Sequence, residues 1–212
     1  MHISDGILSG PVITAGFVGT AAIAAYTLRN MDLEEIPKIS VATSAFFVAS
    51  LIHMPVGPTS VHLILNGLMG ILLGRRAFPA IMLGITLQAI LFGHGGVTAI
   101  GVNTLTMGGG ALLAYGVWQL RHRFSFKKKE QVFAFISAAS GIIFAGLGLA
   151  LALLTTGEQF AATAGMVLMY HIPIMFIEGL VAAATVNFLL KVKPEVLAGY
   201  IPKTPQPAES RT

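Results

Sequence analysis

The chain has 212 residues, of which 55% are apolar and only 10% are charged, and its mean hydropathy is +0.80. This balance excludes an ordinary soluble domain. The net charge of +4 does not indicate nucleic-acid binding, because the basic residues follow a membrane topology, and the chain has no cysteine to form a disulfide or a thiolate metal site. We therefore predict an all-α polytopic membrane bundle.

Taken in chain order, the apolar stretches predict about seven transmembrane helices, since roughly 20 helical residues cross about 30 Å of hydrocarbon. Lysine and arginine occur only at alternate connections, and the other connections contain neither. Because cytoplasmic loops collect these residues, we expect the N-terminus outside and the C-terminus in the cytoplasm. The predicted spans are Pro11–Arg29, Ile39–Leu51, Ser60–Gly74, Phe78–Phe92, Leu105–Leu120, Gln131–Thr155 and Ala161–Leu190.

We expect one transmembrane domain over residues 1–202 and a disordered cytoplasmic tail over residues 203–212, which contains two prolines. A cleaved signal peptide is the alternative interpretation of the first span. We favour a retained segment, because a signal peptide begins with positive charge. This start carries Asp5, and the first lysine or arginine is Arg29, after the apolar run.

Two outer connections are predicted to dip into the bundle. Residues 54–59, Met-Pro-Val-Gly-Pro-Thr, cannot form a regular helix because both prolines lack an amide donor. Irregular backbone at membrane depth is tolerated where it is buried in protein or lines a cavity. We therefore expect this segment to turn inward and to place His62 in the first turn of a helix. The stretch from Gly93–Gly96 to Met107–Gly110 is predicted to be a second inward loop.

The first two residues give the strongest chemical signal. The terminal amine of Met1, the amide of His2 and the His2 imidazole can close one five-membered and one six-membered chelate ring. Three coplanar nitrogens leave a fourth corner, which an inward-facing His62 would fill. A planar four-nitrogen set with a deprotonated amide suits Ni(II), Cu(II) or low-spin Co(II) better than tetrahedral Zn(II) or hard Mg(II). These three residues are the candidate metal ligands.

Other polar residues are weaker candidates. His53 and His94 fall at the outer end, and ordinary loop histidines are the simpler explanation of both. Glu178 is the one acidic residue near mid-membrane, and His171 lies seven residues before it on the same helical face. Ionisable groups inside a membrane favour a functional role. A structural polar pair that holds the last helix is an equal alternative.

Several catalytic motifs are absent. The sequence has no Gly-x-x-x-x-Gly-Lys-Ser/Thr phosphate loop, so we expect no ATP hydrolysis by this chain. It also lacks Gly-x-Ser-x-Gly and His-Glu-x-x-His, the signatures of hydrolases and zinc proteases. We therefore predict that the protein is not an enzyme.

Nearly the whole chain resembles the CbiM/NikM family, the substrate-binding (S) components of energy-coupling-factor transporters for cobalt and nickel. The N-terminal motif and the Ser-x-His loop are specific in combination. The resembling segments are Met-His-Ile-x-Asp-Gly-x-Leu at 1–8, Pro-Val-x-Pro-Thr-Ser-x-His-Leu at 55–63, Gly70–Gly74, Gln88–Gly96, Gly101-x-Asn103, His171-Ile172-Pro173 and Glu178-Gly179.

The resemblance implies a square-planar metal site formed by the terminal amine, the amide and imidazole of His2, and His62. It also implies second-shell roles for Asp5 and Asn103, which would orient the ligands. Many members carry Asp at the place of His94, and His53 is outside the family pattern. The second-shell or accessory candidates are Asp5, His53, Ser60, His94, Asn103, His171 and Glu178.

The resemblance further implies a protein that captures Co(II) or Ni(II) as its transported ligand, needs no cofactor and resides in a prokaryotic plasma membrane. Its partners would be a membrane coupling (T) subunit, a cytoplasmic ATPase pair and, in many systems, a small auxiliary membrane subunit. The alternative is a membrane metal sensor that uses the same site without ATPases. A metal-dependent intramembrane enzyme is disfavoured, because a filled four-nitrogen plane leaves no open position for substrate.

Overall fold

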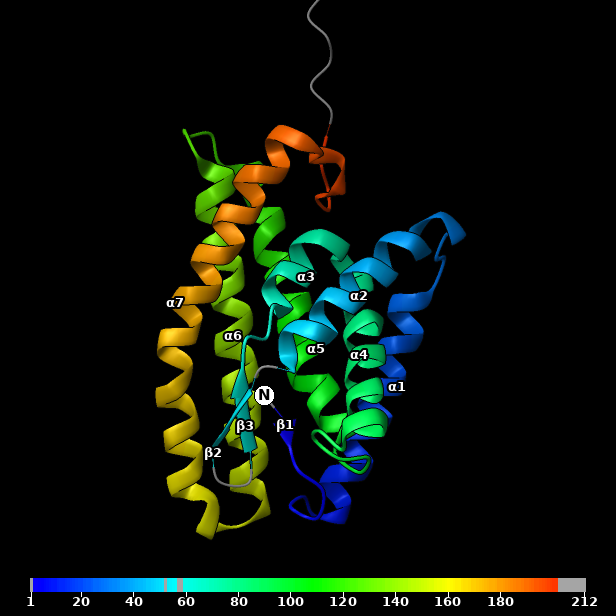
Figure 1. Ribbon diagram of the computed structural model, residues 1–212, viewed down its shortest axis with the longest axis vertical. Helices are drawn as coiled ribbons and strands as arrows, with labels where there is room; N and C mark the ends of the chain where they lie inside the picture. Colours follow the sequence, from blue (N-terminus) through cyan, green and yellow to red (C-terminus); the bar gives the residue numbers. More distant parts are fainter. Residues whose placement is uncertain (1, 52, 57–58, 202–212) are drawn as a thin grey trace, which may run out of the picture.

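Helices account for most of the described chain and run largely lengthwise along the molecule (Figure 1). The computed structural model describes residues 2–51, 53–56 and 59–201, and it describes side chains outside residues 52–62. Met1 and the predicted disordered tail, residues 203–212, therefore lie outside the described residues. The predicted helical membrane bundle is confirmed. Its helices are α1 (Gly10–Leu28), α2 (Ile36–Ser50), α3 (Asn66–Leu73), α4 (Ala77–Phe92), α5 (Ile100–Gln119), α6 (Lys129–Thr156) and α7 (Ala161–Val192).

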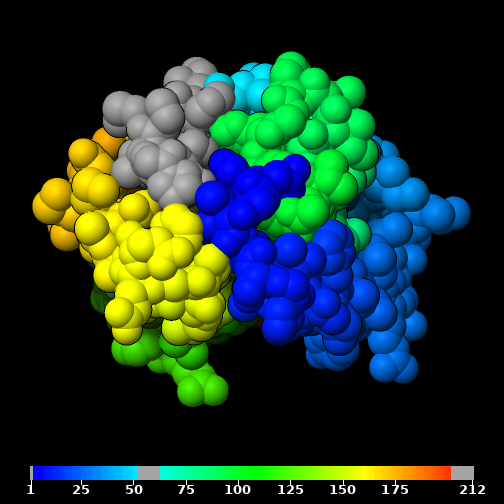
Figure 2. All heavy atoms as spheres, turned by 90° about the horizontal axis from the view of Figure 1, so that it is seen from below, coloured from blue at the N-terminus to red at the C-terminus, as the bar shows by residue number. Residues whose placement is uncertain are grey.

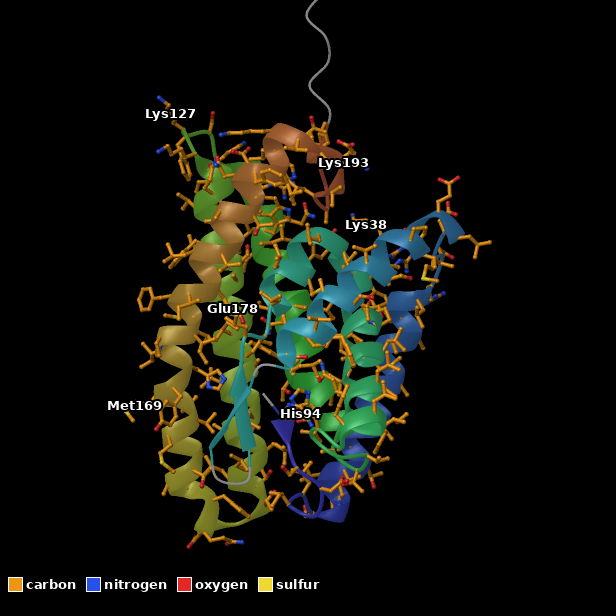
Figure 3. All side chains as sticks on the ribbon, in the orientation of Figure 1. Lys38, His94, Lys127, Met169, Glu178 and Lys193 are labelled. Carbon is orange, nitrogen blue, oxygen red and sulfur yellow. The ribbon has the colours of Figure 1, made fainter. Side chains whose placement is uncertain are left out.

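Five stretches of the described chain are long and apolar enough to cross a membrane. They are α1, the continuous stretch Asn66–Phe92 that joins α3 to α4, and the stretches containing α5, α6 and α7. Helix α2, with 15 residues, is not among them. The count of seven crossings and the orientation therefore stay predictions. Lys38, Lys127 and Lys193 lie at the same end of the bundle (Figure 3), as the predicted topology requires.

A small antiparallel sheet lies in the half of the bundle away from these lysines (Figure 1). It consists of β1 (His2–Ile3), β2 (His53–Val56) and β3 (Thr59–His62), in the order β1-β3-β2. The prediction that residues 54–59 do not form a regular helix is confirmed for residues 54–56 and 59, and residues 57 and 58 lie outside the described residues. The placement of His62 in the first turn of a helix is wrong, and so is the start of the third span at Ser60, because β3 bonds to β1 and β2 and the helix α3 begins only at Asn66.

The second predicted inward loop is shorter than expected. It ends at Ala99, and residues 107–110 belong to α5. A Cβ atom at Gly108 would meet the Phe78 ring, and one at Gly109 would meet the Phe144 ring. Small residues let membrane helices approach closely, so this glycine run is a packing surface and not a turn.

Helix α3 packs tightly against α5 and α6. A Cβ atom at Gly67 would overlap the backbone of Ala138, and one at Gly70 would overlap the carbonyl of Ala111. The buried Asn66 amide donates to the carbonyl oxygen of Gly141 at 3.1 Å. Such close backbone contacts fix the position of α3, and with it the end of the segment that leads out of β3.

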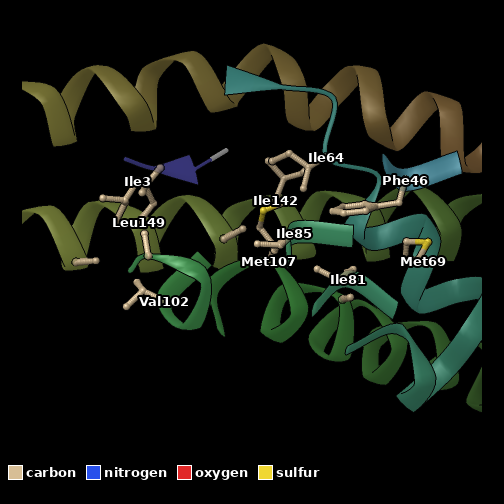
Figure 4. Packing of buried hydrophobic residues seen from close by; sticks show 14 of the residues in the cluster. Ile3, Phe46, Ile64, Met69, Ile81, Ile85, Val102, Met107, Ile142 and Leu149 are labelled. Atoms are coloured by element: carbon tan, nitrogen blue, oxygen red, sulfur yellow. The ribbon is translucent and has the colours of Figure 1, made fainter. Parts of the chain in front are cut away.

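The N-terminal strand is part of the hydrophobic core. Ile3 is fully buried, and Figure 4 shows it beside Leu149 and Val102, which belong to the same cluster of buried residues. Burying an isoleucine side chain contributes about 1.5–3 kcal/mol relative to leaving it exposed. Ile3, the second residue of β1, therefore anchors the start of the chain inside the bundle.

Candidate metal-binding site

The backbone of β1 is held from both sides. On one edge it pairs with β3, with His2 opposite Ser60 and Ile3 opposite Thr59. On the other side, the buried Asn103 amide accepts a hydrogen bond from the Ile3 amide at 2.9 Å and donates one to the Ile3 carbonyl at 3.2 Å. Asn103 lies in the first turn of α5. This double contact fixes the backbone directly after His2.

His2 is buried, and the loop between α4 and α5 lies against its ring. The edge of the His2 ring meets the ring of His94, with centroids 4.4 Å apart and planes at 77°. Gly95 has φ +82°, and a Cβ atom there would lie 2.8 Å from Cδ2 of His2 and 3.0 Å from Nδ2 of Asn103. A side chain at position 95 would therefore displace the imidazole. Only glycine fits both the backbone conformation and the space.

Asp5 ties the start of the chain to the same loop. Its carboxylate accepts hydrogen bonds from the amides of Val97 at 3.0 Å and Thr98 at 2.8 Å, and from the Thr98 hydroxyl at 2.6 Å. The hydroxyl of Thr98, followed by the two amides, lowers the pKa of Asp5 below its usual value. A Cβ atom at Gly96 would overlap the Asp5 carboxyl group. Residues 2–9, which we call the N-terminal strap, are thus fastened at His2, Ile3 and Asp5.

The N-terminal strap closes one end of the bundle. Figure 2 shows the N-terminal residues at the centre of this end, between the α4–α5 region and the turn between α6 and α7. Position 2 is therefore enclosed by protein, although it is next to the chain's beginning. The buried His2 ring is held in place by its contacts with His94 and Gly95.

Among the other predicted site residues, His53, Ser60 and His62 can be placed by their backbone only. His53 is paired with His62 in the β2–β3 ladder, and Ser60 faces His2 across the β1–β3 ladder. The tertiary structure thus brings two of the three predicted ligand positions, His2 and His62, into one sheet. Metal binding by Met1, His2 and His62 stays a prediction.

His171 and Glu178 are bonded to different partners. Nδ1 of His171 lies 2.5 Å from the carbonyl oxygen of Val167, within the same helix. The Glu178 carboxylate accepts hydrogen bonds from the amides of Ile64 and Leu65. Glu178 is thus hydrogen-bonded to the segment between β3 and α3 and not to His171. The functional and the structural role of these two residues both stay predictions.

The sequence interpretation did not include Gly95, Gly96 and Thr98 among the site residues. The glycine pair beside His94 is visible in the sequence, but its role depends on a positive φ and on two side chains that fold against it. Thr98 has no sequence signal of its own. In the part of the chain whose side chains are described, no three histidine, aspartate or glutamate side chains gather into a metal-binding group.

A family model described as "Cobalt uptake substrate-specific transmembrane region" (CbiM) matches residues 2–196. A proposed metal transport protein of Haemophilus influenzae is 36% identical over 93% of this chain and 97% of its own length. A proposed fused nickel transport protein NikMN of Archaeoglobus fulgidus is 26% identical over 93% of this chain and 68% of its own length.

A proposed fused cobalt transport protein CbiMQ of Methanocorpusculum labreanum is 26% identical over 92% of this chain and 36% of its own length. The crystal structure of a transition metal transporter is similar with a TM-score of 0.76 and 19% identity, covering 91% of this chain and 93% of that one. At this identity the structural similarity shows the fold alone.

Proposed function

Because the chain belongs to the CbiM family of cobalt-uptake transmembrane proteins, we propose that it is the substrate-capture subunit of an ATP-driven energy-coupling-factor importer for Co(II) or Ni(II). As a member of this family it is a multi-pass membrane component of cobalt or nickel transport. The coupling to ATP, the metal geometry and the partners are the parts that we propose.

We propose that the metal is held in a square plane by the terminal amine of Met1, the amide and imidazole of His2, and the imidazole of His62. The observation that carries this proposal is the pairing of β1 with β3, with Ser60 opposite His2. His62 is two residues further along the same strand. Asn103 and Asp5 support the site by fixing the backbone that presents His2.

The partners follow from what this chain lacks and from how its relatives are built. It contains no phosphate-binding loop, so ATP hydrolysis has to come from separate cytoplasmic subunits. Two relatives are named as fusions, NikMN and CbiMQ, which supports a membrane coupling subunit and a small auxiliary subunit as partners. We place the N-terminal strap outside the cell, because the lysines labelled in Figure 3 lie at the opposite end of the bundle.

The proposed metal site also helps to distinguish a transporter from an enzyme and from a metal sensor. All four in-plane positions would be held by protein nitrogens, without the metal-bound water that marks a catalytic site, which supports a transport role over an enzymatic one. A metal sensor would use the same ligands without ATPases. Metal uptake by cells that contain or lack the ATPase subunits separates these two functions: uptake that continues without the ATPases would contradict the importer.

The decisive experiment is a Ni(II) and Co(II) titration of purified protein with its native N-terminus, beside a variant with one extra residue before Met1. The matched control carries the same extra residue after Thr212. We expect the N-terminal extension alone to abolish tight binding and the absorption band of a planar complex. Unchanged binding by the extended protein would show that the terminal amine is not a ligand.

His2→Ala and His62→Ala are the companion variants. We expect each to abolish binding and to leave the helical bundle folded, as judged by circular dichroism. Full affinity in either variant would contradict the proposed ligand set.

A further inference from the structure

No side-chain hydrogen bond caps α3 at the point where the segment between β3 and α3 enters the helix. The last residue of β3, His62, is separated from the first residue of α3, Asn66, by Leu63, Ile64 and Leu65. Leu65 has φ 52°, an uncommon conformation for a residue with a branched side chain, and makes no side-chain cap. The amides before a helix need external acceptors when they are buried.

Glu178 of α7 provides those acceptors. Its carboxylate is almost completely buried, and it accepts hydrogen bonds from the amide of Ile64 and from the amide of Leu65, at 2.9 and 3.0 Å in the latter case. Figure 3 shows Glu178 on α7 beside the segment that leads from β3 into α3. A negative charge is also stabilised near the N-terminal end of a helix. A buried carboxylate is costly unless it is bonded in this way, so these contacts fix the segment strongly.

The C-terminal part of the chain holds the other end of α3 as well. The amide of Ala198, which follows α7, donates to the carbonyl oxygen of Ile71 at 2.9 Å. Helix α3 is therefore bonded near both ends to the segment formed by α7 and the residues after it. Its position therefore depends on α7 and the residues after it as well as on α5 and α6.

We infer that Glu178 is a positioning residue for metal capture: it fixes the backbone two residues after His62 and so sets where His62 meets the N-terminal strap. The inference rests on the proposed function, since it assumes that His62 supplies the fourth nitrogen. Glu178 itself is assigned no contact with the metal. Its bonds to backbone amides make its position, and not its charge, the property that matters.

Three substitutions of Glu178 distinguish the effect of where its acceptor oxygens lie from the effect of its negative charge. In Glu178→Gln the amide oxygen can take the place of Oε1, which accepts from both amides, so most of the bonding is kept without the charge. Glu178→Asp keeps the charge, but its side chain is shorter by one methylene group, so the carboxylate lies further from the amides of Ile64 and Leu65. Glu178→Leu removes every acceptor. We expect the affinity for Ni(II) to fall least for Gln and to fall for Leu by about 10–100-fold, the usual effect of losing an outer-shell partner.

The absorption spectrum of the bound Ni(II) provides the readout that a merely structural role would not change. If His62 is displaced, the metal that still binds keeps the N-terminal nitrogens and exchanges the fourth for water, so the planar band shifts. A loss of folding stability alone would lower the amount of protein that binds and leave the band where it is. Asn187→Leu is the matched control, since it removes a hydrogen bond between α7 and Gln131 of α6 without touching α3.

The outcomes are distinct. A Glu178→Leu protein with wild-type affinity and an unshifted band would overturn the inference and leave the proposed function intact. If Glu178→Leu does not fold, the order of the other two variants decides: better binding by Gln than by Asp supports the inference, and the reverse order overturns it. Wild-type protein without a planar band would instead contradict the proposed function.

Discussion

Asn103 and Ile3 are 100 residues apart in the sequence, yet the side-chain amide of Asn103 bonds both backbone groups of Ile3, at 2.9 and 3.2 Å. The contact resembles an additional rung of the sheet, supplied by a side chain of α5 in place of a strand. Both hydrogen bonds go to backbone atoms of Ile3, so they do not depend on the side chain at that position. Its effect is to fix the backbone that continues from His2.

We predict that Asn103→Leu weakens metal binding by about 10–100-fold, because the strand that presents His2 loses one of its two supports. Asn103→Asp keeps an acceptor for the Ile3 amide and should lie between wild type and the Leu variant. The measurement is a calorimetric titration with Ni(II). Thr104→Val is the control: the neighbouring hydroxyl is buried and has no hydrogen-bond partner among the described residues, so its loss should leave affinity unchanged. Equal affinity of Asn103→Leu and wild type would contradict the role of this contact.

A second prediction concerns the glycines of the α4–α5 loop. Gly93 and Gly95 both have positive φ, so an alanine at either position carries the same strain of roughly 1–2 kcal/mol. A Cβ atom at Gly95 meets His2, whereas one at Gly93 meets nothing within 4 Å. We expect Gly95→Ala to abolish tight Ni(II) binding and Gly93→Ala to reduce only the thermal stability. Similar losses of affinity in both variants would show that strain, and not the contact with His2, is responsible.

The contact between His2 and His94 allows a test of whether His94 is a packing partner or an accessory ligand. The geometry is that of an edge-to-face ring pair, worth about 0.5–1.5 kcal/mol. We expect His94→Phe to bind Ni(II) nearly as wild type does and His94→Ala to bind up to about tenfold more weakly. If Phe and Ala weaken binding equally, the imidazole nitrogen itself is required and His94 acts as a ligand.

Asp5 should make the N-terminal strap sensitive to acid. Because its pKa is lowered in the folded protein, its bonds to Val97 and Thr98 stabilise the docked strap fully above the usual carboxyl pKa of about 4. That contribution is lost as the pH falls through the lower, folded value. Hydrogen exchange of residues 2–8 should show decreasing protection in this range. Asp5→Asn should show less protection at neutral pH and no further loss in acid. A wild-type strap that stays equally protected in acid would contradict this prediction.

The sequence by itself determined the class of the fold. Apolar runs of this length, separated by alternately basic and neutral connections, indicate a helical membrane bundle, because a helix satisfies every backbone group in hydrocarbon within its own segment. The same reasoning identified residues 54–59 as non-helical, since their prolines cannot donate. The chelate proposed at Met1 and His2 was also predicted from the sequence, because its three nitrogens are covalently adjacent.

The tertiary structure decided what partners each segment finds. Proline explains why a regular helix is not expected after Met54, but the pairing with the N-terminus and with His53–Val56 makes Thr59–His62 a strand and delays α3 to Asn66. Glycine runs look alike in sequence, yet one becomes a loop around His2 and another a packing face inside α5. The bonds of Glu178 and Asn103 join residues more than 90 positions apart. Such contacts depend on how the helices pack side by side, and a local pattern of residues does not predict which distant segments become neighbours.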